Sequence, residues 1–355
     1  MIERVTIAHS HEQESDPITN FRSRVIGLGS YLPPRIVTNE ELTRYMDTSD
    51  EWIVQRTGIK ERRWVEGATS TSDLAVEASR RALDSAGLAP EDLDMIFFAT
   101  LSPDHYFPGS GVFLQTKLGL TGIPAIDVRQ QCTGFIYALS MADQYIRTGS
   151  AQKILVVGSE VHSKGLDISN RGRDVSVLFG DGAGAVILGA TEVANPHRDS
   201  HLLSIHLYTD GAYAEELWVP AVSTAYDEEI VDQRMLDRGD QYPKMNGRQV
   251  FVHAVKRMPE AVHTAIEQNG YQVNDVDLFV FHQANLRINE AVAHRLGVPD
   301  EKVFNTIEKY GNTTAATIPI GLDAAVKAGR LEPGMLVASA AFGSGFTWAS
   351  ALLRW

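Results

Sequence analysis

The sequence predicts an α/β fold made of two similar halves. Strand and helix patterns alternate along its 355 residues, and strands such as residues 154–157 are apolar throughout, as in sheets covered by helices on both faces. Three segment pairs recur in the same order: residues 82–98 with 265–281, 139–149 with 319–329 and 154–159 with 335–340, at offsets of 183, 180 and 181. Near-equal offsets indicate an internal duplication. We expect halves over 21–195 and 196–355, after a polar N-terminal extension over 1–20.

The first half contains clear element boundaries. Capping residues and apolar runs predict where its helices and strands begin. The expected elements are a strand over 24–33, a short helix started by Thr38 and Glu41, a helix capped by Thr71 or Ser72, and a buried strand over 95–100. In the second half, residues 278–281 form a matching buried strand.

The composition limits the class of protein. Hydrophobic residues make up 44% and charged residues 22%, as in globular proteins with a large core. A single cysteine excludes a disulfide framework and indicates a reducing compartment, so we expect a cytoplasmic protein. No apolar run approaches the ~20 residues of a membrane span, and the start does not resemble a signal peptide. The net charge of −13 argues against nucleic acid as a partner, and an acidic protein partner would need a local basic patch.

The only cysteine, Cys132, lies at a predicted strand-to-helix junction. It follows a strand that ends at Val128, and apolar residues recur at helical spacing from Phe135 to Ile146. A thiol at a helix N-terminus faces free N–H groups and the positive end of the helix dipole, which lower its pKa from about 8.5. The alternative is that Cys132 is a small buried hydrophobic residue.

His282 and Asn312 are the residues that favour a catalytic role for Cys132. His282 directly follows the strand over 278–281, and Asn312 lies 180 residues after Cys132, within the recurrence. The duplication therefore predicts matching positions for Cys132 and Asn312, each at the start of a helix. Carboxyl ends of strands and N-termini of helices share one rim of such sheets, where ligands bind. We expect the three side chains to converge there, although His282 alone would more simply be a loop histidine.

Several motifs together resemble one known family. They are residues 47–59, 179–184, 282–287, 311–316 and 342–348. From about Arg24 to Trp355 the chain is similar to the thiolase-fold condensing enzymes of the β-ketoacyl-acyl-carrier-protein synthase III group. This resemblance implies duplicated α/β halves packed as a five-layered αβαβα core, a homodimer, and no metal or redox cofactor.

The resemblance also implies the reaction. An acyl-CoA primer and malonyl-acyl-carrier-protein would undergo a decarboxylating Claisen condensation that initiates fatty acid synthesis. Cys132 would carry the acyl group, and His282 and Asn312 would hydrogen-bond the malonyl thioester oxygen. The backbone N–H groups of Cys132 and Ser344 would form the oxyanion hole.

Further roles follow from the same resemblance. Trp52 would stack on the adenine of coenzyme A, although a Trp one turn from an Arg could simply stack on it at the surface. The other coenzyme A residues would be Thr48, Arg56 and Arg173, the last favoured over Arg171 by its spacing to Phe179. Phe107 would reach across the dimer interface to line the partner's acyl pocket. The carrier-docking segment would be Gln283, Ala284, Asn285, Leu286 and Arg287, with Arg287 as its key cation.

The chain departs from the family pattern in three places. Ser344 replaces a glycine, and Val252 replaces a lysine for which Lys256 and Arg257 are candidate substitutes. The segment 220–245 is longer than in compact members and is acidic, so we expect a flap over the acyl pocket. Such a flap leaves the identity of the primer undetermined.

Four alternative functions remain at this stage. Val252 and the long segment favour a related acyltransferase of secondary metabolism with other acyl donors or acceptors. Condensation without a malonyl unit needs a glutamate base near Phe107, where the sequence offers only Asp104. A Cys–His–Asn hydrolase would use Asn312 to orient His282. A non-catalytic interaction protein is the least favoured.

Overall fold

Two large sheets form the body of the protein. The computed structural model describes residues 21–225 and 228–355, so the extension expected over 1–20 lies outside the described residues. The first sheet has the order β1 (Phe21–Tyr31), β7 (Gly182–Glu192), β6 (Lys153–Glu160), β4 (Met95–Ala99) and β5 (Ala125–Val128). The second has the order β11 (Leu278–Phe281), β12 (Leu336–Gly343), β13 (Thr347–Arg354) and β8 (His201–Thr209).

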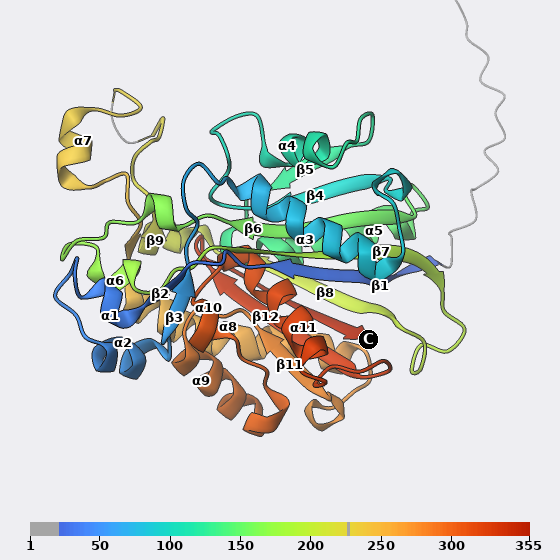
Figure 1. Ribbon diagram of the computed structural model, residues 1–355. Coiled ribbons are helices and arrows are strands. Elements are labelled where there is room, and N and C mark those ends of the chain that lie inside the picture. Colours follow the sequence, from blue (N-terminus) through green and yellow to red (C-terminus); the bar gives the residue numbers. More distant parts are fainter. Residues whose placement is uncertain (1–20, 226–227) are drawn as a thin grey trace, which may run out of the picture.

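Helices cover both sheets and fill the space between them. The longer helices are α3 (Thr71–Ala86), α4 (Ser110–Lys117), α5 (Gly134–Arg147), α8 (Gly247–Gln268), α9 (Leu286–Leu296) and α11 (Thr317–Lys327). Figure 1 shows α3 and α4 on the outer side of the first sheet and α8 and α9 beyond the second. One buried cluster combines residues of α5 and α11 with both sheets, so these two helices are the middle layer. The expected five-layered αβαβα fold is confirmed.

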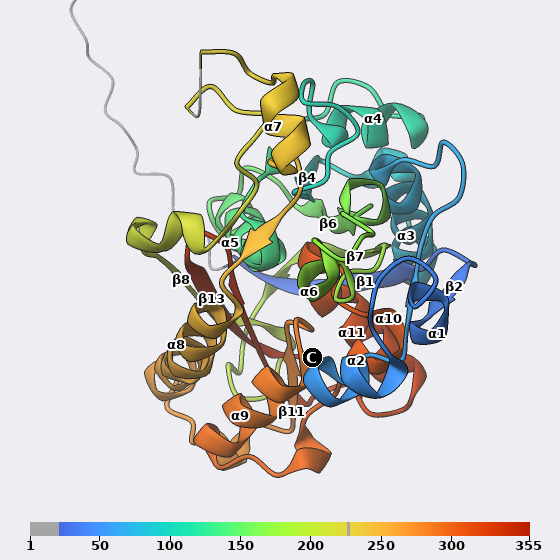
Figure 2. The ribbon, with the colours of Figure 1, turned by 90° about the vertical axis from the view of Figure 1, so that its left-hand side faces the viewer.

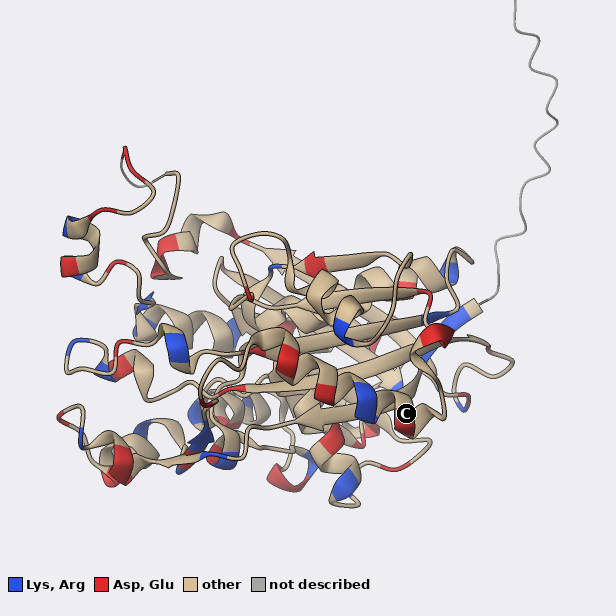
Figure 3. Ribbon diagram, turned by 45° about the horizontal axis from the view of Figure 1, so that its top comes forward, with Lys and Arg blue, Asp and Glu red and all other residues tan. Residues whose placement is uncertain are grey.

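Short elements gather at one end of the molecule, which faces the viewer in Figure 2. They are α1 (Asn39–Leu42), α2 (Asp50–Thr57), α6 (Arg173–Ser176), α7 (Gln233–Arg238), α10 (Ile307–Tyr310), and the strand pairs β2 (Ile36–Thr38) with β3 (Glu61–Arg63) and β9 (Leu217–Trp218) with β10 (Lys244–Met245). The 3₁₀ turns are η1 (Pro90–Asp92), η2 (Gln131–Thr133), η3 (Ser163–Gly165), η4 (Gly211–Glu216), η5 (Val273–Asp275), η6 (Asp300–Lys302) and η7 (Thr314–Ala316). Figure 3 shows charged residues mainly on helices and loops, while the strands are mostly uncharged.

The two sheets repeat one arrangement, at an offset that corrects the position assigned to Asn312. Ile96 pairs with Leu155 between β4 and β6, and the residues 183 positions later, Phe279 and Ala338, pair between β11 and β12. The middle helices begin 183 residues apart, at 134 and 317, but end 180 apart because α11 is three residues shorter. At the helix starts the equivalent of Cys132 is therefore Ala315. The predicted equivalence of Cys132 and Asn312 is wrong, since it applied the offset of the helix ends.

Most of the expected element starts are confirmed. The hydroxyl of Thr38 accepts the N–H of Glu41 and caps α1. The cap of α3 is Ser70, which forms a capping box with Asp73, so the prediction of Thr71 or Ser72 was one or two residues late.

The outer edges of the two sheets differ. In the first sheet the edge strand is β5, whose Ile126 is 37% exposed. In the second sheet the corresponding place beside β11 is reduced to a single bridge between Phe279 and Val303. An edge strand with an exposed apolar side chain is a surface on which a further strand can pair.

Candidate active site

A cavity of about 410 Å³ brings the three predicted catalytic side chains together. Cys132 enters it from the first half, and His282 and Asn312 enter it from the second. The sequence therefore placed all three on the correct rim, even though the offset used for Asn312 was wrong. The cavity continues from these buried residues to Arg56, which is exposed at the surface.

The Cys132 thiol is more deeply enclosed than the helix-terminus argument assumed. It lies in η2, two residues before α5, and is 8% exposed. Burial raises its pKa to about 12, and the nearby Glu160 carboxyl adds to the shift. The expectation of a lowered pKa is therefore wrong, because loss of hydration outweighs the helix end. The resting nucleophile is a thiol.

His282 is held as a neutral base at the end of β11. Its backbone N–H donates to Ala340 O at 2.8 Å, and its Nδ1 lies 2.7 Å from Thr317 Oγ1. The Thr317 hydroxyl donates its proton to Thr314 O at 2.9 Å, so its oxygen accepts from an Nδ1–H of His282. Nε2 then carries a lone pair, and no described residue bonds it. Burial lowers the pKa of His282 to about 3, which keeps the ring neutral.

Asn312 presents its amide nitrogen to the cavity. Its Oδ1 accepts the N–H of Thr314 at 2.8 Å, which leaves the two N–H groups of Nδ2 as the free donors. Its backbone is fixed by the first half, since its N–H donates to Leu178 O at 2.8 Å and its carbonyl accepts from Gly180 N at 3.1 Å. An amide can donate to an oxyanion but cannot act as a base.

Trp52 lies between two arginines where the cavity reaches the surface. The guanidinium carbons of Arg56 and Arg173 lie 4.4 Å and 4.8 Å from its ring centroid. All three residues line the cavity. Arg171 bonds the Asp167 carboxylate and does not line the cavity, which favours Arg173. Stacking on arginine is compatible with both readings of Trp52, so its role toward coenzyme A stays a prediction.

Three other predicted residues lie outside the cavity lining. The Thr48 hydroxyl is buried without a hydrogen-bond partner among the described residues. Ser344 donates its hydroxyl to Leu217 O, and its neighbour Gly343 is the residue that touches Cys132. Phe107 is 80% exposed.

The segment predicted to dock a carrier divides into buried and exposed parts. Gln283 is buried, and its amide binds Phe281 O and the N–H groups of Thr306 and Ile307, so it cannot contact a carrier directly. Asn285 caps α9 and bonds Arg56 O. Ala284 lines the cavity. Leu286 packs closely against Gly58, where an added Cβ would lie 2.5 Å from the Leu286 side chain.

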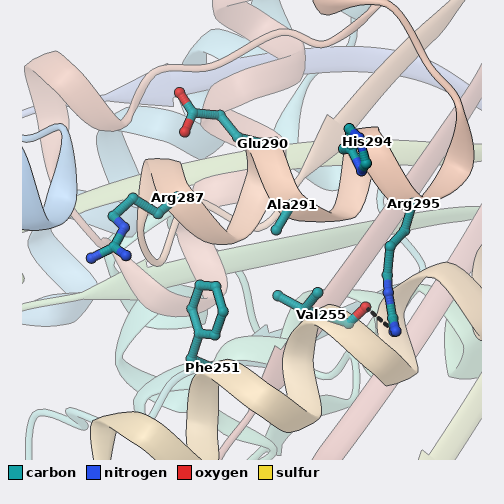
Figure 4. Close-up of a pocket in the computed structure, with 7 residues that line it drawn as sticks. All are labelled: Phe251, Val255, Arg287, Glu290, Ala291, His294 and Arg295. Atoms are coloured by element: carbon teal, nitrogen blue, oxygen red, sulfur yellow. Dashed lines mark hydrogen bonds between the residues drawn. The ribbon is translucent and has the colours of Figure 1, made fainter.

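Arg287 lines a separate groove of about 540 Å³ between α8 and α9. Figure 4 shows Arg287 and Arg295 at its two ends and Phe251 and Val255 on the opposite helix. Arg287 forms no ion pair with any residue the structure describes. With Arg287 and Arg295 against one acid, Glu290, the groove carries a small excess of positive charge and is partly apolar.

Only one of the two candidate substitutes for the missing lysine is available. Val252 is exposed on α8, and Lys256 is exposed one turn later. Arg257 points inward, since it donates to the Asp210 carboxylate at 2.8 Å and lies over Trp348. The expectation that Arg257 could replace the missing lysine is wrong, because its guanidinium already pairs with the Asp210 carboxylate.

The long segment 220–245 is connected to the cavity by the β9–β10 pair. Leu217 and Met245, on these strands, line the cavity, while the flap expected over 220–245 stays a prediction. Further out, Asp240 is fully buried and accepts from both Arg238 and Lys244. Residues 226 and 227 lie outside the described part of the chain.

Sequence analysis missed the residues that position the catalytic groups. A Cβ on Gly343 would lie 2.7 Å from Cys132 Cβ, so only glycine permits this approach. Thr314 and Thr317 hold Asn312 and His282 through the hydrogen bonds described above. Their signal in the sequence is the threonine-rich stretch that follows Asn312.

The geometry weakens two of the alternatives. Asp104 accepts hydrogen bonds from Ser72 and Ser110 and does not line the cavity, so it is not placed as a base. The ring of His282 is oriented by Thr317 rather than by Asn312, contrary to what a Cys–His–Asn hydrolase requires.

In residues 21–225 and 228–355, no helix is long and apolar enough to cross a membrane.

The duplicated five-layer fold with a Cys–His–Asn rim defines a thiolase-fold condensing enzyme. Residues 126–211 match the family described as 3-Oxoacyl-[acyl-carrier-protein (ACP)] synthase III, and residues 266–355 match its C-terminal part. A Beta-ketoacyl-[acyl-carrier-protein] synthase III of Xanthomonas euvesicatoria is 45% identical over 334 residues, 94% of this chain and 98% of the relative. The chain belongs to the 3-oxoacyl-[acyl-carrier-protein] synthase III family. The predicted family and enzyme class, an acyl-transferring condensing enzyme, are confirmed.

Solved structures agree with this assignment. The 3-oxoacyl-[acyl-carrier-protein] synthase III of Aquifex aeolicus has a TM-score of 0.84 at 40% identity, covering 94% of this chain and 100% of its own. The priming β-ketosynthase of the R1128 polyketide pathway has a TM-score of 0.85 at 34% identity, covering 94% and 96%.

Alkylation of the single thiol tests its protonation state. With a raised pKa, the rate of reaction of Cys132 with iodoacetamide should rise about tenfold per pH unit through the neutral range, because only the thiolate reacts. Mass spectrometry of the intact protein measures the rate, and Cys132→Ala gives the background. A rate that levels off near pH 7 would show that the helix end controls the thiol after all.

Proposed function

We propose that this chain condenses an acyl-CoA primer with malonyl-acyl-carrier-protein, releasing carbon dioxide and coenzyme A. The observation that carries the proposal is the meeting of a buried thiol, a neutral imidazole and an oriented amide in one cavity that opens beside Trp52. The relatives' names add the carrier protein and the β-ketoacyl product. The reaction needs no metal or redox cofactor, since sulfur, imidazole and amide groups suffice for each step.

In the first step Cys132 sulfur attacks the thioester carbon of the primer. The thiol proton passes to the lone pair of His282 Nε2 as the new C–S bond forms. The C–S bond to coenzyme A breaks, and its thiolate takes up a proton from the bulk solvent, the one proton that the overall reaction consumes. The product is acyl-Cys132 beside a protonated His282, an ion that burial disfavours and that the incoming malonyl carboxylate can offset.

In the second step the malonyl thioester loses carbon dioxide, and the electron pair becomes an enolate. Asn312 Nδ2–H and His282 Nε2–H donate to the enolate oxygen. The enolate carbon then attacks the acyl carbonyl, forming the C–C bond. The bond to Cys132 sulfur breaks, and the sulfur recovers its proton from His282.

A homodimer is part of the proposal. Phe107 and Tyr106 are largely exposed aromatic residues on one loop, and β5 is an uncovered edge strand of the same half. Burial of both features in a second copy would remove apolar surface from water. The proposal includes the backbone N–H of Ser344 as a donor of the oxyanion hole. It also includes a cytoplasmic location, because the reactive thiol requires a reducing compartment.

An enzyme of secondary metabolism is the second candidate. Val252 and the inward-pointing Arg257 leave fewer cations on α8 for a carrier protein. The structural likeness to a priming polyketide synthase is consistent with that use. The groove with Arg287 and Arg295 favours a carrier protein in either pathway.

Separate measurement of the two steps tests the reaction. Asn312→Ala should still form the acyl-enzyme from acyl-CoA but should lose decarboxylation of malonyl-carrier-protein by about 10²–10³, the cost of one oxyanion donor. Mass spectrometry of the intact protein detects the acyl group, which Cys132→Ala should lack. Acylation of Cys132→Ala, or equal loss of both steps in Asn312→Ala, would contradict the assignment.

Coenzyme A recognition by Trp52 has its own test. Trp52→Ala should raise KM for acyl-CoA roughly fivefold to a hundredfold, because stacking on one base contributes about 1–3 kcal/mol. Trp355→Ala is the control, since Trp355 packs on the central core away from the cavity. If Trp52→Ala lowers the melting temperature without changing KM, the tryptophan is a surface packing residue.

Dimer formation can be measured by light scattering after size exclusion. Phe107→Asp should shift the mass toward that of one chain, because it places a charge in the proposed interface. Tyr45→Asp changes an exposed aromatic residue on another part of the surface and should leave the mass unchanged. A wild-type mass equal to one chain would reject the homodimer.

A further inference from the structure

His162 is a buried residue that has no part in the reaction proposed above. It follows β6, does not line the cavity, and is 7% exposed. Its Nε2 lies 2.6 Å from Thr314 Oγ1, and its ring centroid lies 4.6 Å from that of Phe179. Burial lowers the pKa of His162 to about 3, so the ring stays neutral. A neutral, buried imidazole requires such a partner to satisfy its ring nitrogens.

Thr314 connects His162 to both second-half catalytic residues. Its N–H donates to Asn312 Oδ1 at 2.8 Å, and its carbonyl accepts from Thr317 Oγ1 at 2.9 Å. Thr317 Oγ1 in turn lies 2.7 Å from His282 Nδ1. One residue thus determines which amide atom of Asn312 faces the cavity and how the ring of His282 is held.

The conformation of Thr314 needs external support. Its φ is +49°, a left-handed value that is rare and costly for a β-branched residue. The side-chain bond from His162 is the contact that fixes its hydroxyl. Without that bond the turn could relax toward an ordinary conformation, and its N–H would no longer hold Asn312 Oδ1.

We propose that His162 is a positioning residue that, through Thr314, orients the amide of Asn312 and the ring of His282 for decarboxylation. Phe179 strengthens this arrangement from the other side, since it packs on His162 and forms a parallel bridge with Asn312. The inference rests on the proposed function. Its effect falls on the second step, because decarboxylation uses the amide of Asn312 as well as His282. The attack of Cys132 on the primer uses His282 alone, whose backbone is also fixed by its bond to Ala340 O.

Two substitutions separate the hydrogen bond from the packing. His162→Phe keeps a flat ring against Phe179 but removes the nitrogen that meets Thr314. His162→Gln offers an amide to the same hydroxyl. His162→Phe should lower kcat for malonyl-carrier-protein decarboxylation about tenfold to a hundredfold, as expected when a reacting group is misplaced, and should change acyl loading less than about threefold. His162→Gln should recover most of the lost decarboxylation.

His201→Phe is the matched control. His201 is also buried and bonded through its ring, to Asp199 O, but it lies away from the cavity. The variant His201→Phe should leave both acyl loading and decarboxylation unchanged. If His162→Phe does not fold, Thr314→Ala removes the same hydrogen bond from the other side and should show the same split between the steps.

The outcomes are distinct. The proposal is overturned if His162→Phe decarboxylates as fast as the unaltered enzyme, if it loses acyl loading and decarboxylation equally, or if His162→Gln is no better than His162→Phe. A failure of the unaltered protein to acylate Cys132 or to decarboxylate malonyl-carrier-protein would reject the proposed function instead.

Discussion

A short parallel bridge between Phe179 and Asn312 joins the two halves at the site, and the other contacts of the site depend on it. The N–H of Asn312 donates to Leu178 O, and Gly180 donates back to Asn312 O. Cys132 belongs to one half and His282 to the other, so this contact helps to set their relative position, together with the shared core of α5 and α11. The Arg62 guanidinium is fully buried beside the bridge and donates to Val177 O. Burial lowers its pKa to about 10, still high enough to remain charged. A charge of this kind is retained where it fixes backbone carbonyls that would otherwise be unpaired.

Burial sets the protonation states of the reacting groups. The thiol of Cys132, whose pKa is raised, and the imidazole of His282, whose pKa is lowered, are both neutral in the cavity. Charge then develops only when substrate supplies an oxyanion or carboxylate for the hydrogen-bond donors. The same low polarity strengthens the hydrogen bond from each donor to the enolate. Helix α5 orients the Cys132 turn and contributes its N–H groups, but it does not by itself create a thiolate.

The sequence predicted the fold and the catalytic trio well, because both depend on local patterns and on repetition. It failed where the outcome depended on which contacts form in space. The offset for Asn312 was wrong because α11 is three residues shorter than α5. The C-terminal ends of these helices are 180 residues apart, whereas their starts, near the site, are 183 apart. Gln283 belongs to the docking motif, yet its amide is consumed by backbone groups of the next loop. Arg257 has the right charge and spacing, but Asp210, 47 residues away in the sequence, accepts its hydrogen bond.

The duplication explains how one thiol and one imidazole come to share a confined space. At the offset of 183, Cys132 corresponds to Ala315 and His282 to Ala99, so each reactive side chain has a small residue as its counterpart. Both alanines lie beside the start of α5, where a Cβ on Gly134 would meet them at 3.3 and 3.6 Å. The same offset pairs Glu160 with Gly343. In the first half the Glu160 carboxylate accepts from Thr100 and Ser102 and fills its position. In the second half Gly343 has no side chain at this position, and Cys132 occupies the space. The two halves therefore share a backbone plan, and the site exists because their side chains differ in size where they meet.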